Sequence, residues 1–214
     1  ADDFGAVDLD IPTLLSARTS VQAGSSYAWS GGILNANVGL VVARGSTPET
    51  ALSNVHIGFR PVDTDNVALL PAHINLNSDN SGGADMADLG TTRLRYGRVS
   101  LQDSYGPETS NLPVKFLTEY WNGSDWIQNL DDSCTSLALS DIQYPNGAIS
   151  TPANRTVVVG SGSTNGQYGN LNASTIRFTS GDAGHYFTAP GGGNTGAVIV
   201  NVNMANYPWL QFDW

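Results

Sequence analysis

Two tryptophans are the first residues of this chain whose type and spacing could do chemistry. Trp121 and Trp126 flank an Asn122-Gly123 pair, and Asn-Gly between two strand-like runs predicts a tight hairpin. A two-residue loop would place both tryptophans and Glu119 on one face as diagonal neighbours, because strand side chains alternate. Exposed indole rings on a sheet are typical of carbohydrate binders, since sugars stack their C–H faces on aromatic rings. The alternative is that both tryptophans belong to the core.

Two oxygen-rich loops are candidates for binding calcium. The side chains concerned are Asn77, Asp79, Ser81 and Asp88 in one loop, and Asp63 and Asp65 in another. The first loop resembles the D-x-D-x-D-G calcium loop with an acid at its twelfth position, although it begins with Asn and ends with Asp. Solvated turns with Asx hydrogen bonds explain the same residues. Calcium is therefore the one candidate cofactor.

The remaining reactive side chains lack the partners that catalysis needs. Cys134 is flanked by Asp131 and Asp132, and neighbouring carboxylates raise the pKa of a thiol instead of activating it. A buried structural cysteine, or one paired with a cysteine elsewhere in a longer chain, is expected. The three histidines stand outside any catalytic or metal-binding motif. A pair of Asp residues acting as in a glycoside hydrolase stays open as an alternative.

The charge balance argues against several classes of partner. The net charge is -10, and Lys115 is the only lysine. Nucleic-acid binding needs a basic surface, and anionic membranes attract basic ones, so neither partner is expected. No apolar stretch has transmembrane length, so direct insertion into a membrane is not expected either.

Composition and patterning predict an all-β, sandwich-like fold of antiparallel strands with long Gly/Asn/Asp-rich loops and little helix. Residues 112–121 are the longest predicted strand, and residues 197–204 alternate cleanly, whereas residues 161–172 are predicted as a loop. The alternating pattern slips at Gly97, which indicates a bulge or strand bend. Residues 1–214 form one β-rich domain, or two packed β subdomains with a boundary near residue 90. We also expect the natural chain to continue beyond Trp214.

Several spaced motifs resemble the MshQ-like proteins, which are encoded with mannose-sensitive haemagglutinin type IV pili. The matching segments are residues 94–101, 105–108, 112–114, 120–124, 131–135, 189–191, 194–196, 208–210 and 212–214. The resemblance covers most of the chain and is tightest from about Arg93 onward. It implies a region of unknown function in a large, multi-domain surface protein, and it brings no catalytic residues.

These observations lead to three functional hypotheses. The first is a non-enzymatic extracellular module of a pilus-associated protein, secreted or on the bacterial cell surface, which acts in adhesion or pilus assembly. Its partners would be glycans or pilus and surface proteins. The second is a carbohydrate-binding module of a polysaccharide-degrading system, and the third is a glycoside hydrolase-type enzyme.

Overall fold

The protein is almost entirely β-structure, as the sequence predicts. The computed structural model describes residues 4–10, 15, 17–30, 33–63 and 87–211. Its strands form antiparallel sheets, and two short 3-10 turns lie in the later part of the chain. The chain divides into two compact units: Ala1–Thr47 with Ala51–Arg95, and Pro48–Thr50 with Tyr96–Trp214.

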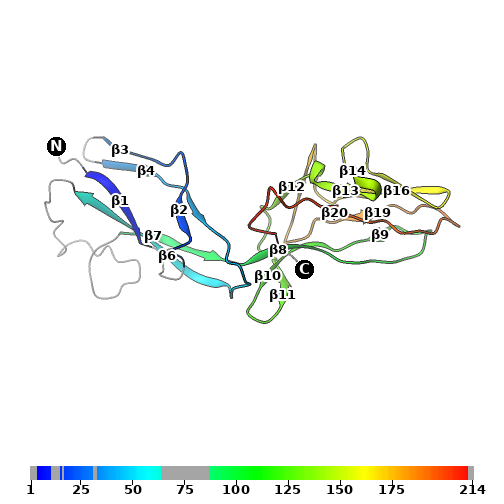
Figure 1. Cartoon of the computed structure of the whole chain (residues 1–214), viewed down its shortest axis with the longest axis horizontal. Helices are drawn as coiled ribbons and strands as arrows, with labels where there is room; N and C mark the ends of the chain where they lie inside the picture. The colour runs from blue at the N-terminus through cyan, green and yellow to red at the C-terminus, as the bar shows by residue number, and fades with distance from the viewer. Residues whose placement is uncertain (1–3, 11–14, 16, 31–32, 64–86, 212–214) are drawn as a thin grey trace. The chain divides into compact units, whose positions relative to one another are not determined.

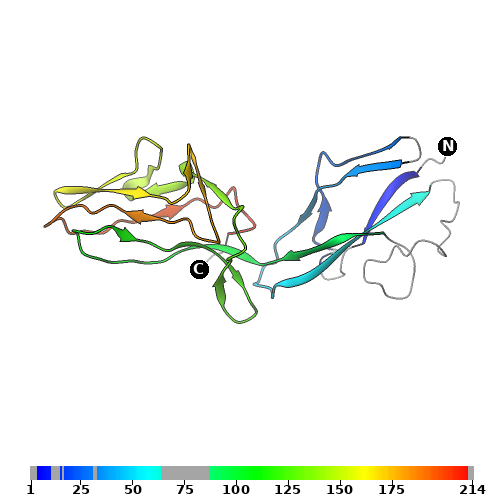
Figure 2. The same ribbon diagram turned by 180° about the vertical axis from the view of Figure 1, so that it is seen from behind.

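The first unit contains the strands that precede residue 95 (Figures 1 and 2). They are β1 (Phe4–Asp10), β2 (Thr19–Val21), β3 (Ser26–Ser30), β4 (Ile33–Asn37), β5 (Leu40–Val42), β6 (Leu52–Asp63) and β7 (Ala87–Leu94). β6 lies between β1 and β7 in a three-stranded sheet, and β2–β5 and β3–β4 are two-stranded ladders. Leu15 and Val55 are buried apolar residues of this unit.

The second unit contains shorter strands in four sheets. They are β8 (Gly97–Leu101), β9 (Leu112–Pro113), β10 (Phe116–Trp121), β11 (Trp126–Gln128), β12 (Ser136–Ala138), β13 (Ile142–Tyr144), β14 (Ala148–Ile149), β15 (Thr156–Val159), β16 (Gly162–Gln167), β17 (Leu171–Asn172), β18 (Thr175–Arg177), β19 (Tyr186–Phe187) and β20 (Asn201–Val202), with 3-10 turns η1 (Leu139–Asp141) and η2 (Pro145–Gly147). The sheet orders are β11-β10-β8, β12-β18-β17, β14-β13-β20 and β15-β16-β19-β9.

One hydrophobic core joins these four sheets. Its buried members are Val114, Phe116, Leu137, Leu139, Ile142, Tyr144, Val157, Tyr168, Ile176, Phe178, Ala183 and Phe187. Phe116 and Phe178 are fully buried and pack edge to face at 5.4 Å between ring centroids, a favoured aromatic geometry. Each sheet thus has one face on the core, as in a β-sandwich.

The predicted continuous strand over residues 112–121 is interrupted. β9 pairs with β19, whereas β10 pairs with β8, so the chain changes partner between Pro113 and Phe116. The switch is marked by two separate bonds: Val114 donates to the His185 carbonyl, and Gln102 donates to the Lys115 carbonyl. The alternation of apolar and polar side chains does not change when a strand changes its partner. The sequence pattern therefore does not reveal this change.

The slip at Gly97 is a break between strands and not a bulge. β7 ends at Leu94 and β8 begins at Gly97, and the division between the two units falls between Arg95 and Tyr96. A Cβ at Gly97 would lie 3.1 Å from Leu210 Cδ2, so the glycine permits this close approach. The loop predicted over residues 161–172 is also wrong, because β16 and β17 lie there.

Candidate functional site

The second unit contains an open groove with apolar side chains on its floor. Its volume is ≈ 1100 Å³. The apolar residues that line it include Val99, Leu101, Leu112, Val114, Phe187, Val198, Val200, Val202 and Leu210. Several of these, Val99, Leu101, Val198 and Val200 among them, are only half-buried although they pack against the core. The groove is therefore a part of the core that the chain leaves open.

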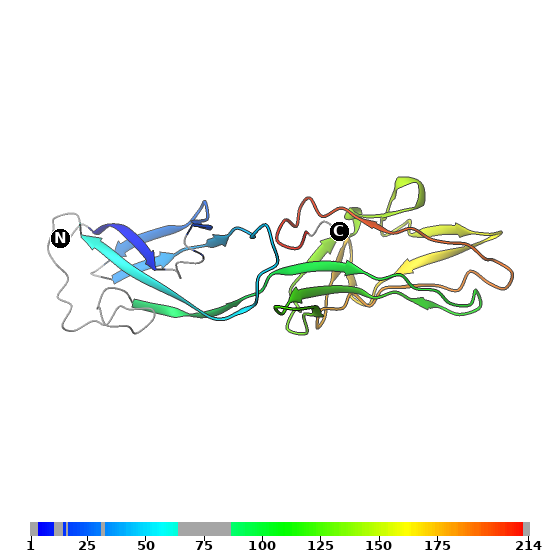
Figure 3. The ribbon, with the colours of Figure 1, turned by 60° about the horizontal axis from the view of Figure 1, so that its bottom comes forward.

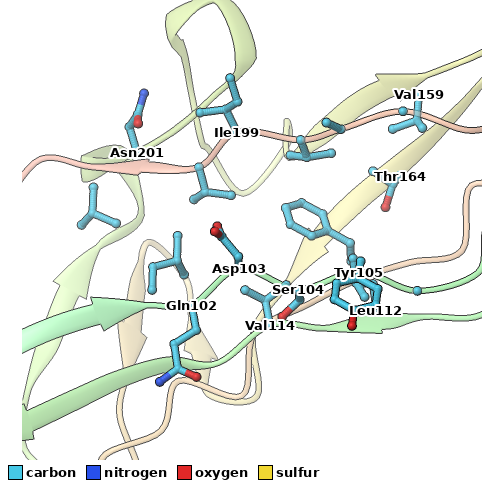
Figure 4. Close-up of a pocket in the computed structure, with 18 of the residues that line it drawn as sticks. Gln102, Asp103, Ser104, Tyr105, Leu112, Val114, Val159, Thr164, Ile199 and Asn201 are labelled. Atoms are coloured by element: carbon cyan, nitrogen blue, oxygen red, sulfur yellow. The ribbon is translucent and has the colours of Figure 1, made fainter. Parts of the chain in front are cut away.

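Two segments far apart in the sequence form the walls of this groove. One follows β8, at residues 101–106, and the other is the extended segment at residues 196–202. Figure 4 shows both: Gln102, Asp103, Ser104 and Tyr105 come from one wall, and Ile199 and Asn201 from the other. Figure 3 shows the green segment and the orange-red segment running along the same part of this unit.

The walls are joined at both ends and unpaired between them. At one end Val99 donates to the Leu210 carbonyl at 3.1 Å, and at the other Gly191 donates to the Glu108 carbonyl at 3.0 Å. Among the described residues, no backbone hydrogen bond involves residues 196–200 or 103–106. Most of these residues are exposed, so their backbone groups are open to water or to a partner.

Alternation of the backbone shows which groups face the groove. Val99 donates to Leu210, away from β10, whereas Gln102 donates to Lys115, on the side of β9 and β10. Since N–H and C=O groups alternate between the two edges of a strand, the backbone groups of Leu101 at the end of β8 turn away from β10 and toward the groove.

The same reasoning applies to the opposite wall. Asn203 donates to the Asp141 carbonyl beside β13, and Val202 pairs with Ile142. The odd-numbered residues of this segment therefore turn their backbone groups toward β13. The backbone groups of Val198 and Val200 turn toward the groove.

The charged side chains that line the groove are Asp103 and Glu108, and both are acidic. Backbone N–H groups of Glu108 itself and of Gly193 hydrogen-bond the Glu108 carboxylate and lower its pKa, which keeps it ionised. No lysine, arginine or histidine lies among the described lining residues. The groove therefore has a negative potential.

The aromatic hairpin lies on the β11-β10-β8 sheet, with a register that differs from the predicted one. Trp121 pairs directly with Trp126, and Glu119 pairs with Gln128, so the loop holds residues 122–125. The prediction of a two-residue loop with diagonal tryptophans was therefore wrong. The rings are direct neighbours, at 5.7 Å between centroids and 63° between planes.

The surroundings of the two indoles shape what they can bind. Both are half-buried, and their inclined planes do not form one flat platform. The guanidinium of Arg98 lies 4.3 Å from the centre of the Trp126 ring, a cation–π contact that covers one face of this indole. The Arg98 Nε also donates to the Glu119 carboxylate at 2.7 Å. Glu119 is buried, and its charge is balanced within the protein.

The calcium candidates fall largely outside the described residues. Asn77, Asp79, Ser81 and Asp65 all lie there, whereas Asp63 ends β6 and Asp88 lies in β7, opposite Gly58. In the parts of the chain that the structure describes, no group of three His, Cys, Asp or Glu side chains is placed to hold a metal ion. The calcium site stays a prediction.

The single cysteine is exposed, which rules out the buried alternative, and its pairing with a cysteine elsewhere in a longer chain stays a prediction. Asp132 next to it is buried and accepts hydrogen bonds from the backbone N–H groups of Cys134 and Thr135, at 3.1 Å and 2.9 Å. Although burial acts to raise the pKa of Asp132, hydrogen bonds from Thr135 and Cys134 lower it below its ordinary value. The Asp132 carboxylate therefore holds this segment in a turn, and the Cys134 thiol is exposed.

The groove itself could not be predicted from the sequence. Its walls come from residues about 100 positions apart, and the only local signal was the alternating run over residues 197–204. In that run the side chains of Val198, Val200, Val202 and Met204 are half-buried, as the alternation predicts.

Comparison with known proteins gives one match. The model of DUF6701, fourth domain, matches residues 95–214, which correspond closely to the second unit. No curated protein and no solved structure gives a significant match to this chain. In the described part of the chain, no helix has the length and apolar character needed to cross a membrane.

Proposed function

Because this chain belongs to the DUF6701 family, whose fourth domain it carries in residues 95–214, we propose that it is a non-enzymatic binding module of an MshQ-like bacterial surface protein. It acts in adhesion or pilus assembly, and its binding site is the groove of the second unit. The motifs that resemble MshQ-like proteins support the setting outside the cell.

The observation that carries the proposal is the open, apolar groove between two unpaired walls. Half-buried valine and leucine side chains on its floor gain stabilisation when a partner removes them from water, at about 25 cal/mol per Å². Concave sites lined by apolar side chains with a few polar groups are common binding sites in proteins. A partner that covers these side chains would therefore gain binding free energy.

The acidic side chains of the groove favour binding over hydrolysis. A glycosidase needs one carboxyl group with a raised pKa to act as a general acid. Backbone N–H groups lower the pKa of Glu108 instead. Of the two acids that line the groove, Glu108 thus lacks the protonation that a general acid requires.

Carbohydrate binding is the second candidate, and Tyr105 favours it. This side chain is 98% exposed at the rim of the groove, so its ring is free to stack on a sugar. The apolar floor favours a partner with apolar side chains over a sugar.

The test of the proposal is binding by the whole chain to a glycan array, with and without calcium, and to purified type IV pili. Val200→Trp would fill the groove, and Val158→Trp is the matched control, because Val158 is 76% exposed and lies outside the groove. We expect Val200→Trp to weaken binding about tenfold or more, and Val158→Trp to leave it unchanged.

Two results would contradict the proposed function. One is full binding by a folded Val200→Trp protein, which would place the site elsewhere. The other is turnover of a polysaccharide or peptide with defined kinetics, lost in Asp103→Asn. Tyr105→Ala separates the two candidates, because it should weaken a stacked sugar strongly and an apolar partner little.

A further inference from the structure

We infer that the groove is filled by a β-strand from another polypeptide chain, which completes the sandwich. The strand is extended, has apolar side chains at alternate positions and carries at least one lysine or arginine. This inference rests on the proposed function, since it names the partner that the binding groove takes.

Backbone groups on both walls are the first argument. The N–H and C=O groups of Leu101 turn toward the groove from one side, and those of Val198 and Val200 from the other. Unpaired strand edges are templates for another strand. A strand between these walls would bond on both sides, which a single exposed edge does not offer.

The floor of the groove provides the second argument. Val99, Leu101, Val198 and Val200 point inward and are half-buried, whereas Ile199 between two of them is 63% exposed. An inserted strand would turn every second side chain onto this floor and the others to solvent. The partner therefore needs the same period-two alternation that this wall shows.

The size of the groove agrees with a strand. A residue in a sheet takes up roughly 160 Å³, given about 3.3 Å of rise, 4.8 Å between strands and 10 Å between packed sheets. The cavity of ≈ 1100 Å³ then accommodates about seven residues, close to the usual length of a strand. The bonds of Val99 to Leu210 and of Gly191 to Glu108 close its two ends.

Charge determines the polar part of the partner. The charged side chains lining the groove are Asp103 and Glu108, and Figure 4 shows the Asp103 carboxylate between the two walls. A lysine or arginine on the strand would meet these acids, and an acidic strand would be repelled. Affinity should therefore fall as salt rises.

The experiment uses the whole chain and a fluorescein-labelled peptide of about nine residues. The peptide alternates valine with threonine and carries one central lysine. A second peptide has the same composition with its valines grouped together, and a third is the first with N-methyl groups on alternate backbone amides. Fluorescence anisotropy gives Kd for each. We expect saturable binding of the first peptide alone, because only it has both the alternation and its backbone donors.

Two proline variants form a matched pair in the wall. Val198→Pro removes an N–H that faces the groove, whereas Ile199→Pro removes one that faces the other side. Neither N–H has a backbone partner in the structure, and an unpaired edge tolerates proline. We expect Val198→Pro to weaken the peptide about fivefold or more, through the loss of at least one hydrogen bond, and Ile199→Pro to leave Kd unchanged.

Asp103→Asn provides a test that does not depend on backbone changes. It should weaken the lysine peptide about threefold at low salt. It should have no effect on the same peptide with glutamine in place of lysine. This variant keeps the size of the side chain, so its fold is preserved.

Three outcomes would overturn the inference. The first is equal binding, or none, for the three peptides with folded wild-type protein. The second is a concentration-dependent dimer, seen by sedimentation equilibrium and lost in Val198→Pro, since a second copy would then be the occupant. The third is glycan binding that Val200→Trp abolishes but Val198→Pro does not, which would retain the groove as the site and replace the strand with a sugar.

Discussion

The imidazole of His185 lies inside the core of the second unit, where its charge has little support. It is 3% exposed, and it stacks on Tyr168 at 4.7 Å between ring centroids. Its Nδ1 donates to the Gln167 carbonyl at 3.0 Å, and its Nε2 is buried without a hydrogen-bond partner among the described residues. Burial lowers the pKa of His185, although the bond to Gln167 opposes this shift. The histidine is therefore a neutral core residue.

This lowered pKa predicts a loss of stability in mild acid. Below the unfolded-state pKa of about 6.5, His185 binds a proton in the unfolded chain but not in the folded chain. The free energy of unfolding is therefore highest above that pH and decreases below it. As the pH falls below about 6.5, the free energy of unfolding should decrease by up to about 1.4 kcal/mol per pH unit. Urea unfolding followed by tryptophan fluorescence measures this.

His185→Phe is the control for that pH dependence. The variant leaves the Gln167 carbonyl unpaired, which should cost about 1–3 kcal/mol at every pH, but it removes the titrating group. Its stability should depend on pH less steeply than that of the wild type. Parallel slopes for the two proteins would show that His185 does not carry the effect.

At the scale of elements, the turn between β10 and β11 shows how one side chain sets a register. Asn122 Oδ1 accepts hydrogen bonds from the backbone N–H groups of Ser124 and Asp125, both at 2.8 Å. Gly123 has a φ of 113°, which favours glycine. Together they hold a loop of residues 122–125 in place of the two-residue turn, and the tryptophans become direct partners as a result.

Asn122→Ala tests the contribution of this turn. It removes two bonds to backbone donors in an exposed loop, and should lower the free energy of unfolding by about 1 kcal/mol. Asn122→Asp keeps the acceptor and should retain most of the stability. Urea denaturation of the three proteins provides the measurement, and an alanine variant as stable as the wild type would assign the register to the tryptophan pair instead.

For the whole molecule, the relevant feature is that the chain forms two compact units. The hydrophobic core of the second unit is made of residues between Val114 and Phe187, with further apolar side chains from β8 and the 198–207 segment. Units with separate cores usually unfold in separate steps. We therefore predict two transitions in differential scanning calorimetry of the whole chain.

The variant Leu137→Ala identifies which of the two transitions is the unfolding of the second unit. Leu137 is fully buried in the second unit, and truncating such a leucine costs about 3 kcal/mol. One transition should move down by roughly 10 °C, and the other should stay in place. An equal shift of both transitions would mean that the chain unfolds as one cooperative unit.

The sequence by itself determined the fold class and the direction of several side chains. Turn-forming residues between short apolar runs predicted the all-β fold, and alternation predicted the inward side chains of Val198 and Val200. These features are local, because the period of a strand is read from neighbouring residues. The motifs from Arg93 onward agree in extent with the DUF6701 match over residues 95–214.

Only the tertiary structure decided which strands pair. Residues 162–167 are glycine and polar residues without a strand pattern, and they form β16 because β15 and β19 bond to both of its edges. The groove likewise exists because Leu210 and Gly191 close its ends against Val99 and Glu108, far away in sequence. Hydrogen bonds between distant backbones depend on geometry and not on residue type, so the sequence left both the register and the groove undetermined.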